Sequence, residues 1–206
     1  MKDKSPIIVI DYGMGNIASV LNMIHFVGGE ARLSISPDEV KEAQTLILPG
    51  IGSFDAGIKA LHDTGMDVAI HEAVDHGATI LGICLGMQLF MESSEEGRLP
   101  GLGLVPGNVK RFQVLDLGLR VPHMGWNVVR PVRPSILFDP GPDEQRFYFV
   151  HSYYVECDDP RDVTGVTRYG QEFTSSLERG RVIGVQFHPE KSHRFGMNLF
   201  KRLMEA

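Results

Sequence analysis

Cysteine is scarce in this sequence, in which Cys84 and Cys157 are the two cysteines among 206 residues. Two cysteines do not make a disulfide framework, so the folded core has to be stable without a network of disulfide bonds. In a reducing compartment both thiols stay free, and a free thiol is available as a nucleophile. A chain of this length is most simply one domain with a sizeable core.

Long runs of one charge and long apolar runs are also lacking. The 20 basic and 26 acidic side chains give a net charge of −6, which argues against nucleic acid or an anionic membrane surface as the main partner. Residues 5–10 are too short for a signal-peptide core, and no later segment approaches a membrane span. We therefore expect a cytosolic protein without membrane association.

Short apolar runs alternate with helical patterns in the first part of the chain. Strands are predicted at residues 6–10, 31–35, 45–48 and 79–83, and helices at 17–27, 37–43, 54–61 and 66–75. This alternation predicts a parallel sheet with helices on both faces.

Beyond residue 92 the pattern changes to short strands broken by glycine and proline. We predict strands at residues 103–105, 108–112, 126–129, 136–138, 146–155, 163–169, 173–177 and 182–187, then a helix at 198–204. The predicted fold is α/β: an open mixed sheet, mainly parallel, flanked by helices on both faces, with an antiparallel β extension. We expect residues 1–206 to form a single domain.

The central motif is Gly82-Ile83-Cys84-Leu85-Gly86, which follows the strand at 79–83 and opens a helix at Leu85. This spacing is typical of a nucleophile elbow, a sharp turn that lifts the middle side chain out of the sheet. Unpaired N–H groups at the helix start would favour a thiolate at Cys84. The alternative is a buried structural cysteine in a strand-to-helix turn.

A second motif, His188-Pro189-Glu190, follows the strand at 182–187. Proline keeps His188 extended, so the side chains of His188 and Glu190 project to the same side. The carboxylate then orients the imidazole, which takes the thiol proton in a Cys-His-Glu triad. A metal site formed by His188 and His193 is the alternative, but no further ligands lie at suitable spacing.

Several loops are candidates for binding. Gly50, Ile51 and Gly52 follow a strand and form either an oxyanion loop or a turn with Ser53 as helix cap. Gln88, one helical turn after Cys84, either holds a ligand or solvates the helix. Ser152 is disfavoured as a nucleophile because adjacent strand residues His151 and Ser152 face opposite sides.

Residues 13–18 fit the dinucleotide pattern Gly-x-Gly-x-x-Ala, and a nucleotide-binding module is the hypothesis from a different functional class. A tight turn explains these glycines without a ligand. We favour the turn, because Arg32 rather than an acidic residue follows the next strand.

Together the motifs resemble the class I glutamine amidotransferases, and more closely the glutaminase subunits of imidazole glycerol phosphate synthases. The resemblance spans almost the whole chain, with Ile51 and His193 as mild departures. It rests on Asp-Tyr-Gly-Met-Gly-Asn at residues 11–16, Pro-Gly-Ile-Gly-Ser-Phe at 49–54, Gly-Ile-Cys-Leu-Gly-Met-Gln at 82–88, Pro-His-Met-Gly-Trp-Asn at 122–127, His-Ser-Tyr at 151–153 and Gly-Val-Gln-Phe-His-Pro-Glu-Lys-Ser at 184–192.

The resemblance implies a role for each matching residue. Cys84 would attack the carboxamide of glutamine, with His188 as base and acid and Glu190 as its orienter. N–H groups of Leu85 and of the loop Gly50, Ile51 and Gly52 would bind the oxyanion, while Gln88, Ser152 and Tyr153 hold glutamine.

The resemblance also implies a heterodimer with a (β/α)₈ cyclase subunit, which receives the ammonia and makes imidazole glycerol phosphate in histidine biosynthesis. Tyr12, Asn16 and Trp126 would face that partner. No cofactor and no metal are implied. The alternative within the same chemistry is the glutaminase subunit of pyridoxal 5′-phosphate synthase or another thiol amidohydrolase.

Overall fold

The computed structural model describes residues 5–114, 116, 118–141 and 144–206. One half of the fold is a parallel sheet, ordered β2-β1-β3-β4-β12. Its strands are β1 (Ile7–Ile10), β2 (Ala31–Ser34), β3 (Thr45–Gly50), β4 (Thr79–Cys84) and β12 (Val182–Val185). Every residue of β1, β4 and β12 is buried, because helices cover both faces of the sheet.

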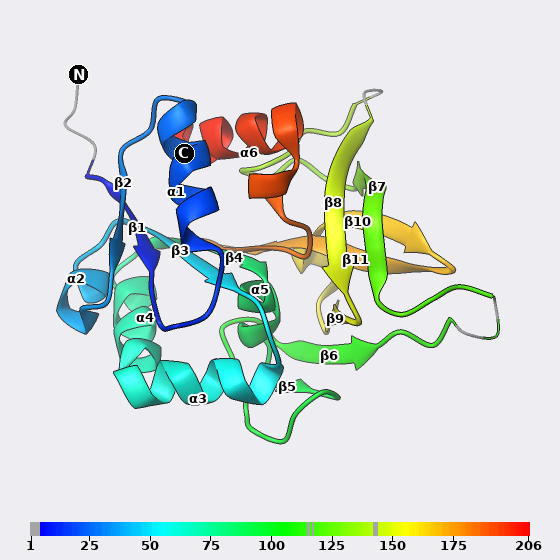
Figure 1. The fold of residues 1–206 in the computed structure, drawn as a ribbon, viewed down its shortest axis with the longest axis horizontal. Helices are drawn as coiled ribbons and strands as arrows, with labels where there is room; N and C mark the ends of the chain where they lie inside the picture. Colours follow the sequence, from blue (N-terminus) through cyan, green and yellow to red (C-terminus); the bar gives the residue numbers. More distant parts are fainter. Residues whose placement is uncertain (1–4, 115, 117, 142–143) are drawn as a thin grey trace.

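Two groups of helices cover the opposite faces of this sheet, as Figure 1 shows. One face carries α1 (Ile17–Phe26) and α6 (His193–Glu205), and the other carries α2 (Pro37–Lys41), α3 (Phe54–Thr64), α4 (Met66–Asp75) and α5 (Leu85–Leu89). The apolar core is accordingly split into two clusters, one on each face. No helix in the described part of the chain is long and apolar enough to cross a membrane.

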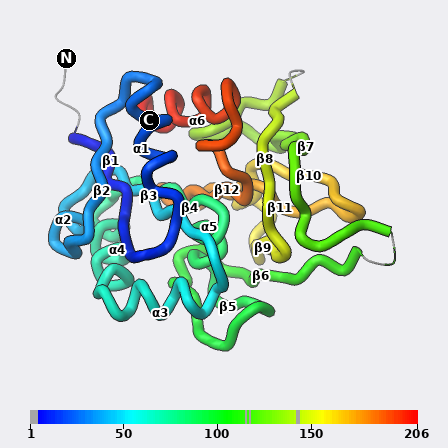
Figure 2. Tube along the Cα trace, viewed as in Figure 1, coloured from blue at the N-terminus to red at the C-terminus, as the bar shows by residue number. Residues whose placement is uncertain are grey.

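The other half of the fold is antiparallel and continues from β12, which Figure 2 shows beside β4. It adds β11 (Gln171–Arg179), β10 (Val163–Tyr169), β7 (His123–Pro131) and β8 (Gln145–His151) in that order. A branch is formed by β5 (Ser93–Ser94), β6 (Gly107–Arg111) and β9 (Tyr153–Cys157), joined to the sheet through β11. Two short 3₁₀ turns, η2 (Pro160–Asp162) and η3 (Pro189–Lys191), precede β10 and α6.

The predicted α/β class and mixed open sheet are confirmed, but two predicted strands are wrong. Residues 103–105 form a loop whose N–H groups bond back to the end of α5, with Val105 donating to the Phe90 carbonyl. Residues 136–138 form a turn closed by Ser135. Residues 103–105 and 136–138 both contain buried apolar side chains, but neither segment forms a strand. The run 146–155 is also divided, since Ser152 separates β8 from β9.

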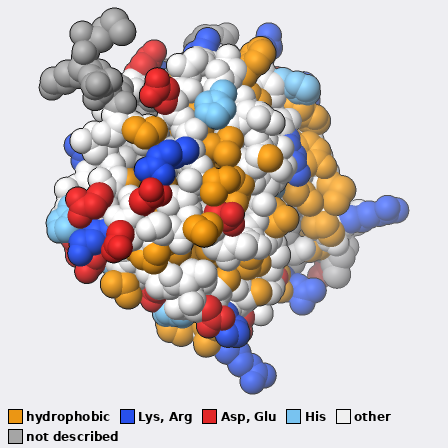
Figure 3. Space-filling view, turned by 60° about the vertical axis from the view of Figure 1, so that its left-hand side comes forward, with side chains coloured by type: hydrophobic (Ala, Val, Ile, Leu, Met, Phe, Trp, Pro, Cys, Tyr) orange, Lys and Arg blue, Asp and Glu red, His pale blue; other side chains and the backbone are white. Residues whose placement is uncertain are grey.

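The surface carries charges of both signs. On the face shown in Figure 3, acidic and basic side chains are interspersed rather than gathered into a field of one sign. This distribution agrees with the modest net charge of −6.

The turn between β4 and α5 has the predicted elbow geometry. Cys84 has φ 55° and ψ −107°, a strained backbone conformation for a residue other than glycine. A Cβ on Gly82 would lie 2.5 Å from the ring of Phe90, and a Cβ on Gly86 would collide with the Leu48 carbonyl oxygen. The two glycines are therefore required by the close approach of α5 to the sheet.

We expect Gly86→Ala to lower the free energy of unfolding by about 1–3 kcal/mol, because the methyl group has to displace backbone of β3. Gly141→Ala is the matched control, since a Cβ there meets no atom within 4 Å. Urea denaturation of both variants measures the difference. Equal stability of the two variants would contradict the packing argument.

Candidate active site

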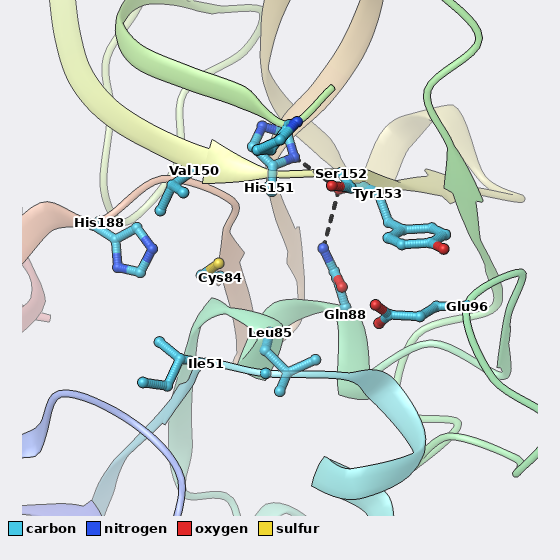
Figure 4. A pocket seen from close by; sticks show the side chains of 12 residues that line it. Ile51, Cys84, Leu85, Gln88, Glu96, Val150, His151, Ser152, Tyr153 and His188 are labelled. Atoms are coloured by element: carbon cyan, nitrogen blue, oxygen red, sulfur yellow. Dashed lines mark hydrogen bonds between the residues drawn. The ribbon is translucent and has the colours of Figure 1, made fainter. Parts of the chain in front are cut away.

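Pairing of β4 with β12 brings two distant parts of the chain to one edge of the sheet. Ile83 is in register with Val185, so Cys84 ends β4 beside the segment that leads from β12 to His188. His188 is extended, with φ −103° and ψ 94°, and its N–H donates to the Tyr148 carbonyl at 2.9 Å. Cys84 and His188 line the same cavity, and Figure 4 shows their side chains next to each other.

The imidazole of His188 is held by Glu190. His188 Nδ1 lies 2.8 Å from Glu190 Oε1, and the two side chains are 3% and 2% exposed. An extended backbone was predicted for both His188 and Glu190. His188 is extended, but Glu190 lies in the 3₁₀ turn η3. With Nδ1 engaged, Nε2 is left for the cavity, where the Cys84 sulfur is its neighbour.

The electrostatics favour a protonated His188. Burial alone would lower the pKa of His188, but its interactions with the Cys84 sulfur and Glu190 carboxylate raise it to about 10. At neutral pH His188 therefore holds a proton beside the sulfur. The sequence predicted that the start of a helix would favour a thiolate at Cys84. Helix α5 is only five residues long, so its dipole favours the thiolate less than a long helix would.

The second cysteine is unsuited to this chemistry. Burial, and to a smaller extent the negative charges of nearby aspartates, raise the pKa of Cys157 to about 12. A thiol with such a pKa is almost fully protonated at neutral pH and is a poor nucleophile.

Gln186 also reaches the sulfur, although the sequence analysis did not single it out. Its Nε2 donates to Cys84 Sγ at 3.7 Å, and the residue is fully buried. The sequence signal that could have found it was a polar residue within the apolar run 182–187.

The cavity has a volume of about 320 Å³, within the range of small-molecule sites. It brings together most of the predicted binding residues, whereas Gly50 does not line it and packs close to Leu85 and Tyr12. Its lining comprises Ile51, Gly52, Cys84, Leu85, Gln88, Glu96, Pro122, Val150, His151, Ser152, Tyr153 and His188. Gln88 is 5% exposed and thus belongs to the site rather than to a solvated helix face.

Glu96 is a second residue that the sequence analysis missed. Its carboxylate lies at the side of the cavity away from His188, near Gln88 (Figure 4). Ser53 is the N-cap residue of α3, as one of the two alternatives had it, but its side chain makes no capping bond; Glu96 Oε2 accepts the N–H of Phe54 at 2.8 Å instead. Because it follows a run of polar residues, no local pattern distinguished it from a solvated side chain.

The three residues expected to face a partner differ in exposure. Trp126 is 43% exposed and stacks on His193 with ring centroids 5.6 Å apart, and Asn16 is half-buried. Tyr12 is 3% exposed, and its hydroxyl has no partner among the described residues. Burial and the charge of Cys84 raise the pKa of Tyr12. A direct contact of Tyr12 with a partner is not supported by this burial.

Neither alternative site gains support from the described residues. They contain no group of three or more His, Cys, Asp or Glu side chains placed to hold a metal ion. Gly15, in the candidate nucleotide motif, has φ 130° and lies against Pro49, where a Cβ would approach to 3.2 Å. Close packing of the turn therefore accounts for this glycine.

The family model described as glutamine amidotransferase class-I matches residues 8–205. The chain belongs to the class I glutamine amidotransferases. A relative from Pseudomonas aeruginosa, described as imidazole glycerol phosphate synthase subunit HisH 2, is 48% identical over 200 residues that cover 97% of this chain and 98% of the relative. A relative of the same description from Methanococcus maripaludis is 46% identical over 200 residues, with coverage of 97% and 98%.

Solved structures share the amidotransferase fold at low sequence identity. PurLQS from Thermotoga maritima has a TM-score of 0.77 and 19% identity, with 98% of each chain covered. A glutamine amidotransferase from the same organism has a TM-score of 0.60 and 20% identity, with 98% of this chain and 82% of that chain covered. These likenesses support the fold alone.

We expect the pKa of His188, followed by NMR, to lie well above its usual 6.5 and to fall in Cys84→Ser, where the sulfur that raises it is missing and burial lowers it. The raised folded-state pKa stabilises the fold fully below pH 6.5, and this contribution is lost as the pH rises toward about 10. Identical titration of His188 in the wild type and Cys84→Ser would exclude the pair.

Proposed function

We propose that this amidotransferase hydrolyses glutamine to glutamate and ammonia as the glutaminase subunit of an imidazole glycerol phosphate synthase. The observation that carries the proposal is the buried Glu190–His188 pair beside the Cys84 elbow in the wall of one small cavity. The names of the two 46–48% identical relatives support the specific subunit.

The reaction begins with the Cys84 thiolate, which attacks the carboxamide carbon of glutamine. The carbonyl electron pair moves to oxygen, where N–H groups of Leu85 and the loop Gly50, Ile51 and Gly52 stabilise it. Collapse of this intermediate breaks the C–N bond, and His188 Nε2 gives its proton to the departing ammonia. A glutamyl thioester remains on Cys84.

Water completes the cycle. His188, now neutral, takes a proton from a water molecule as its oxygen attacks the thioester carbon. The second tetrahedral intermediate collapses to glutamate and restores the thiolate beside protonated His188. Glu190 stays hydrogen-bonded to Nδ1 throughout, which keeps Nε2 aimed at the reacting atoms.

Glu96 is placed to recognise the amino group of glutamine. The cavity is lined by a sulfur nucleophile at one side and a carboxylate at the other, so an α-ammonium group at Glu96 would direct the carboxamide toward Cys84. Gln88, Ser152 and Tyr153 line the wall between these ends.

Ammonia would pass to a (β/α)₈ cyclase subunit, completing the heterodimer. Free ammonia is mostly protonated at neutral pH and then no longer nucleophilic, so an enclosed route to the partner preserves its reactivity. The exposed apolar side chains of Met124 and Trp126, which are 61% and 43% exposed, support a partner on this side of β7. Asn16 is the further candidate contact.

Glutamine hydrolysis by the purified chain, in the presence and absence of a cyclase subunit together with its nucleotide ligand, tests the function. We expect the cyclase to raise the rate and Cys84→Ala to lower it by roughly 10³-fold or more, because triad residues act as a unit. Cys157→Ala is the control and should retain the wild-type rate. Turnover retained in Cys84→Ala would exclude the mechanism, and stimulation by a pyridoxal 5′-phosphate synthase subunit instead would favour the alternative partner.

Glu96→Gln tests the substrate-binding assignment separately. We expect KM for glutamine to rise about 10- to 100-fold with a smaller change in kcat, because a neutral amide loses the charge attraction to ammonium. Glu95→Gln makes the same change in the neighbouring residue, which does not line the cavity. Unchanged KM in Glu96→Gln would place the amino group elsewhere.

A further inference from the structure

A buried chain of polar groups runs from β7 to the cavity wall. Asn127 Nδ2 lies 3.1 Å from His123 Nε2, His123 Nδ1 lies 2.9 Å from His151 Nε2, and His151 Nδ1 lies 2.7 Å from the Tyr153 carbonyl oxygen. The proposed triad chemistry uses none of the first three side chains. His123 and His151 are 3% and 6% exposed.

The direction of each hydrogen bond in this chain follows from its ends. The Tyr153 carbonyl only accepts, so His151 carries its proton on Nδ1 and accepts at Nε2. His123 therefore carries its proton on Nδ1 and accepts from Asn127 at Nε2. The other bonds of the Asn127 amide require the same orientation: its oxygen accepts from the Val128 N–H, and its nitrogen also donates to the Arg168 carbonyl.

The same reasoning continues from Tyr153 to the sulfur. Gln88 Nε2 donates to the Tyr153 carbonyl at 3.1 Å and to Gln186 Oε1 at 3.0 Å. Gln186 Nε2 is thereby turned toward Cys84 Sγ, at 3.7 Å. Figure 4 shows the links from His151 through Tyr153 to Gln88. Both N–H groups of the Gln88 amide are used, which leaves its oxygen as the acceptor facing the cavity beside Glu96.

We propose that Asn127, His123 and His151 form a positioning relay that fixes the Tyr153 carbonyl and, through it, the amide orientations of Gln88 and Gln186. The relay presents an N–H donor to the Cys84 thiolate and an acceptor to the ammonium group of the substrate. These three are positioning residues, since they act through Tyr153. The substrate part of this inference rests on the proposed glutaminase function.

The surroundings of the histidines suit this role. His123 stacks between Tyr169 and Phe149, with ring centroids 4.1 and 4.8 Å away, and Phe112 lies 5.3 Å from His151. Burial lowers the pKa of His123 to about 4 and that of His151 to about 3, so both rings are neutral near pH 7. Neutral rings are required, because each must accept at one nitrogen while it donates at the other.

NMR of the ¹⁵N-labelled protein tests the relay without any substrate. We expect both His123 and His151 to be neutral near pH 7 with the proton on Nδ1, as read from the nitrogen shifts of each ring. A proton on Nε2 of His151, or a charged ring at either position, would overturn the assignment. This measurement does not depend on glutamine hydrolysis. It therefore tests the relay even if the proposed glutaminase function is wrong.

Two substitutions of His151 test its effect on the site. Asn and Leu are nearly isosteric, but His151→Asn keeps an N–H donor for the Tyr153 carbonyl, whereas His151→Leu has none. We expect kcat/KM for glutamine to fall about 10- to 100-fold more in His151→Leu than in His151→Asn, as for other groups that orient reacting residues. Urea denaturation of both variants measures whether they fold.

Alkylation of Cys84 by iodoacetamide provides a second reading that needs no substrate. Peptide mass spectrometry separates Cys84 from Cys157, and we expect slower modification of Cys84 in His151→Leu than in His151→Asn. Equal alkylation rates, or equal kcat/KM in folded samples of the two variants, would overturn the relay and leave the histidines a packing role.

Discussion

The parallel pairing of β4 with β12 is the constraint on which the site depends. It joins segments about a hundred residues apart and sets Cys84 and His188 at the same strand ends. The carboxyl edge of a parallel sheet is where side chains from several strands converge, and here β3 contributes the loop with Ile51 and Gly52. A change in this register would separate the nucleophile from its base.

The electrostatics of the site depend on the same arrangement. A buried imidazolium is costly unless favourable partners lie beside it, and the Cys84 sulfur and the Glu190 carboxylate are those partners. Gln186 adds a neutral donor to the sulfur from within the core. The strained backbone of Cys84 persists because Gly82 and Gly86 allow α5 to pack tightly on the sheet.

Local patterns were sufficient to predict the elbow, the His-Pro-Glu segment and the alternation of strands and helices. They depend on neighbouring residues, so the sequence contains them directly. Glu96, Gln186 and the His123–His151 pair were not predicted as site residues, because their roles arise from contacts between segments far apart in the chain. For the same reason Glu96 rather than Ser53 supplies the side-chain bond to the first turn of α3, and residues 103–105 bond to the end of α5 rather than to a strand.

Labelling with a diazoketone analogue of glutamine tests the central claim most directly. A thiolate beside a protonated imidazole should displace nitrogen from this analogue and keep the carbon chain as a thioether. The account predicts one adduct per chain, located on Cys84 by peptide mass spectrometry and prevented by excess glutamine. An adduct on Cys157, or Cys84 left unmodified while glutamine is still hydrolysed, would contradict it.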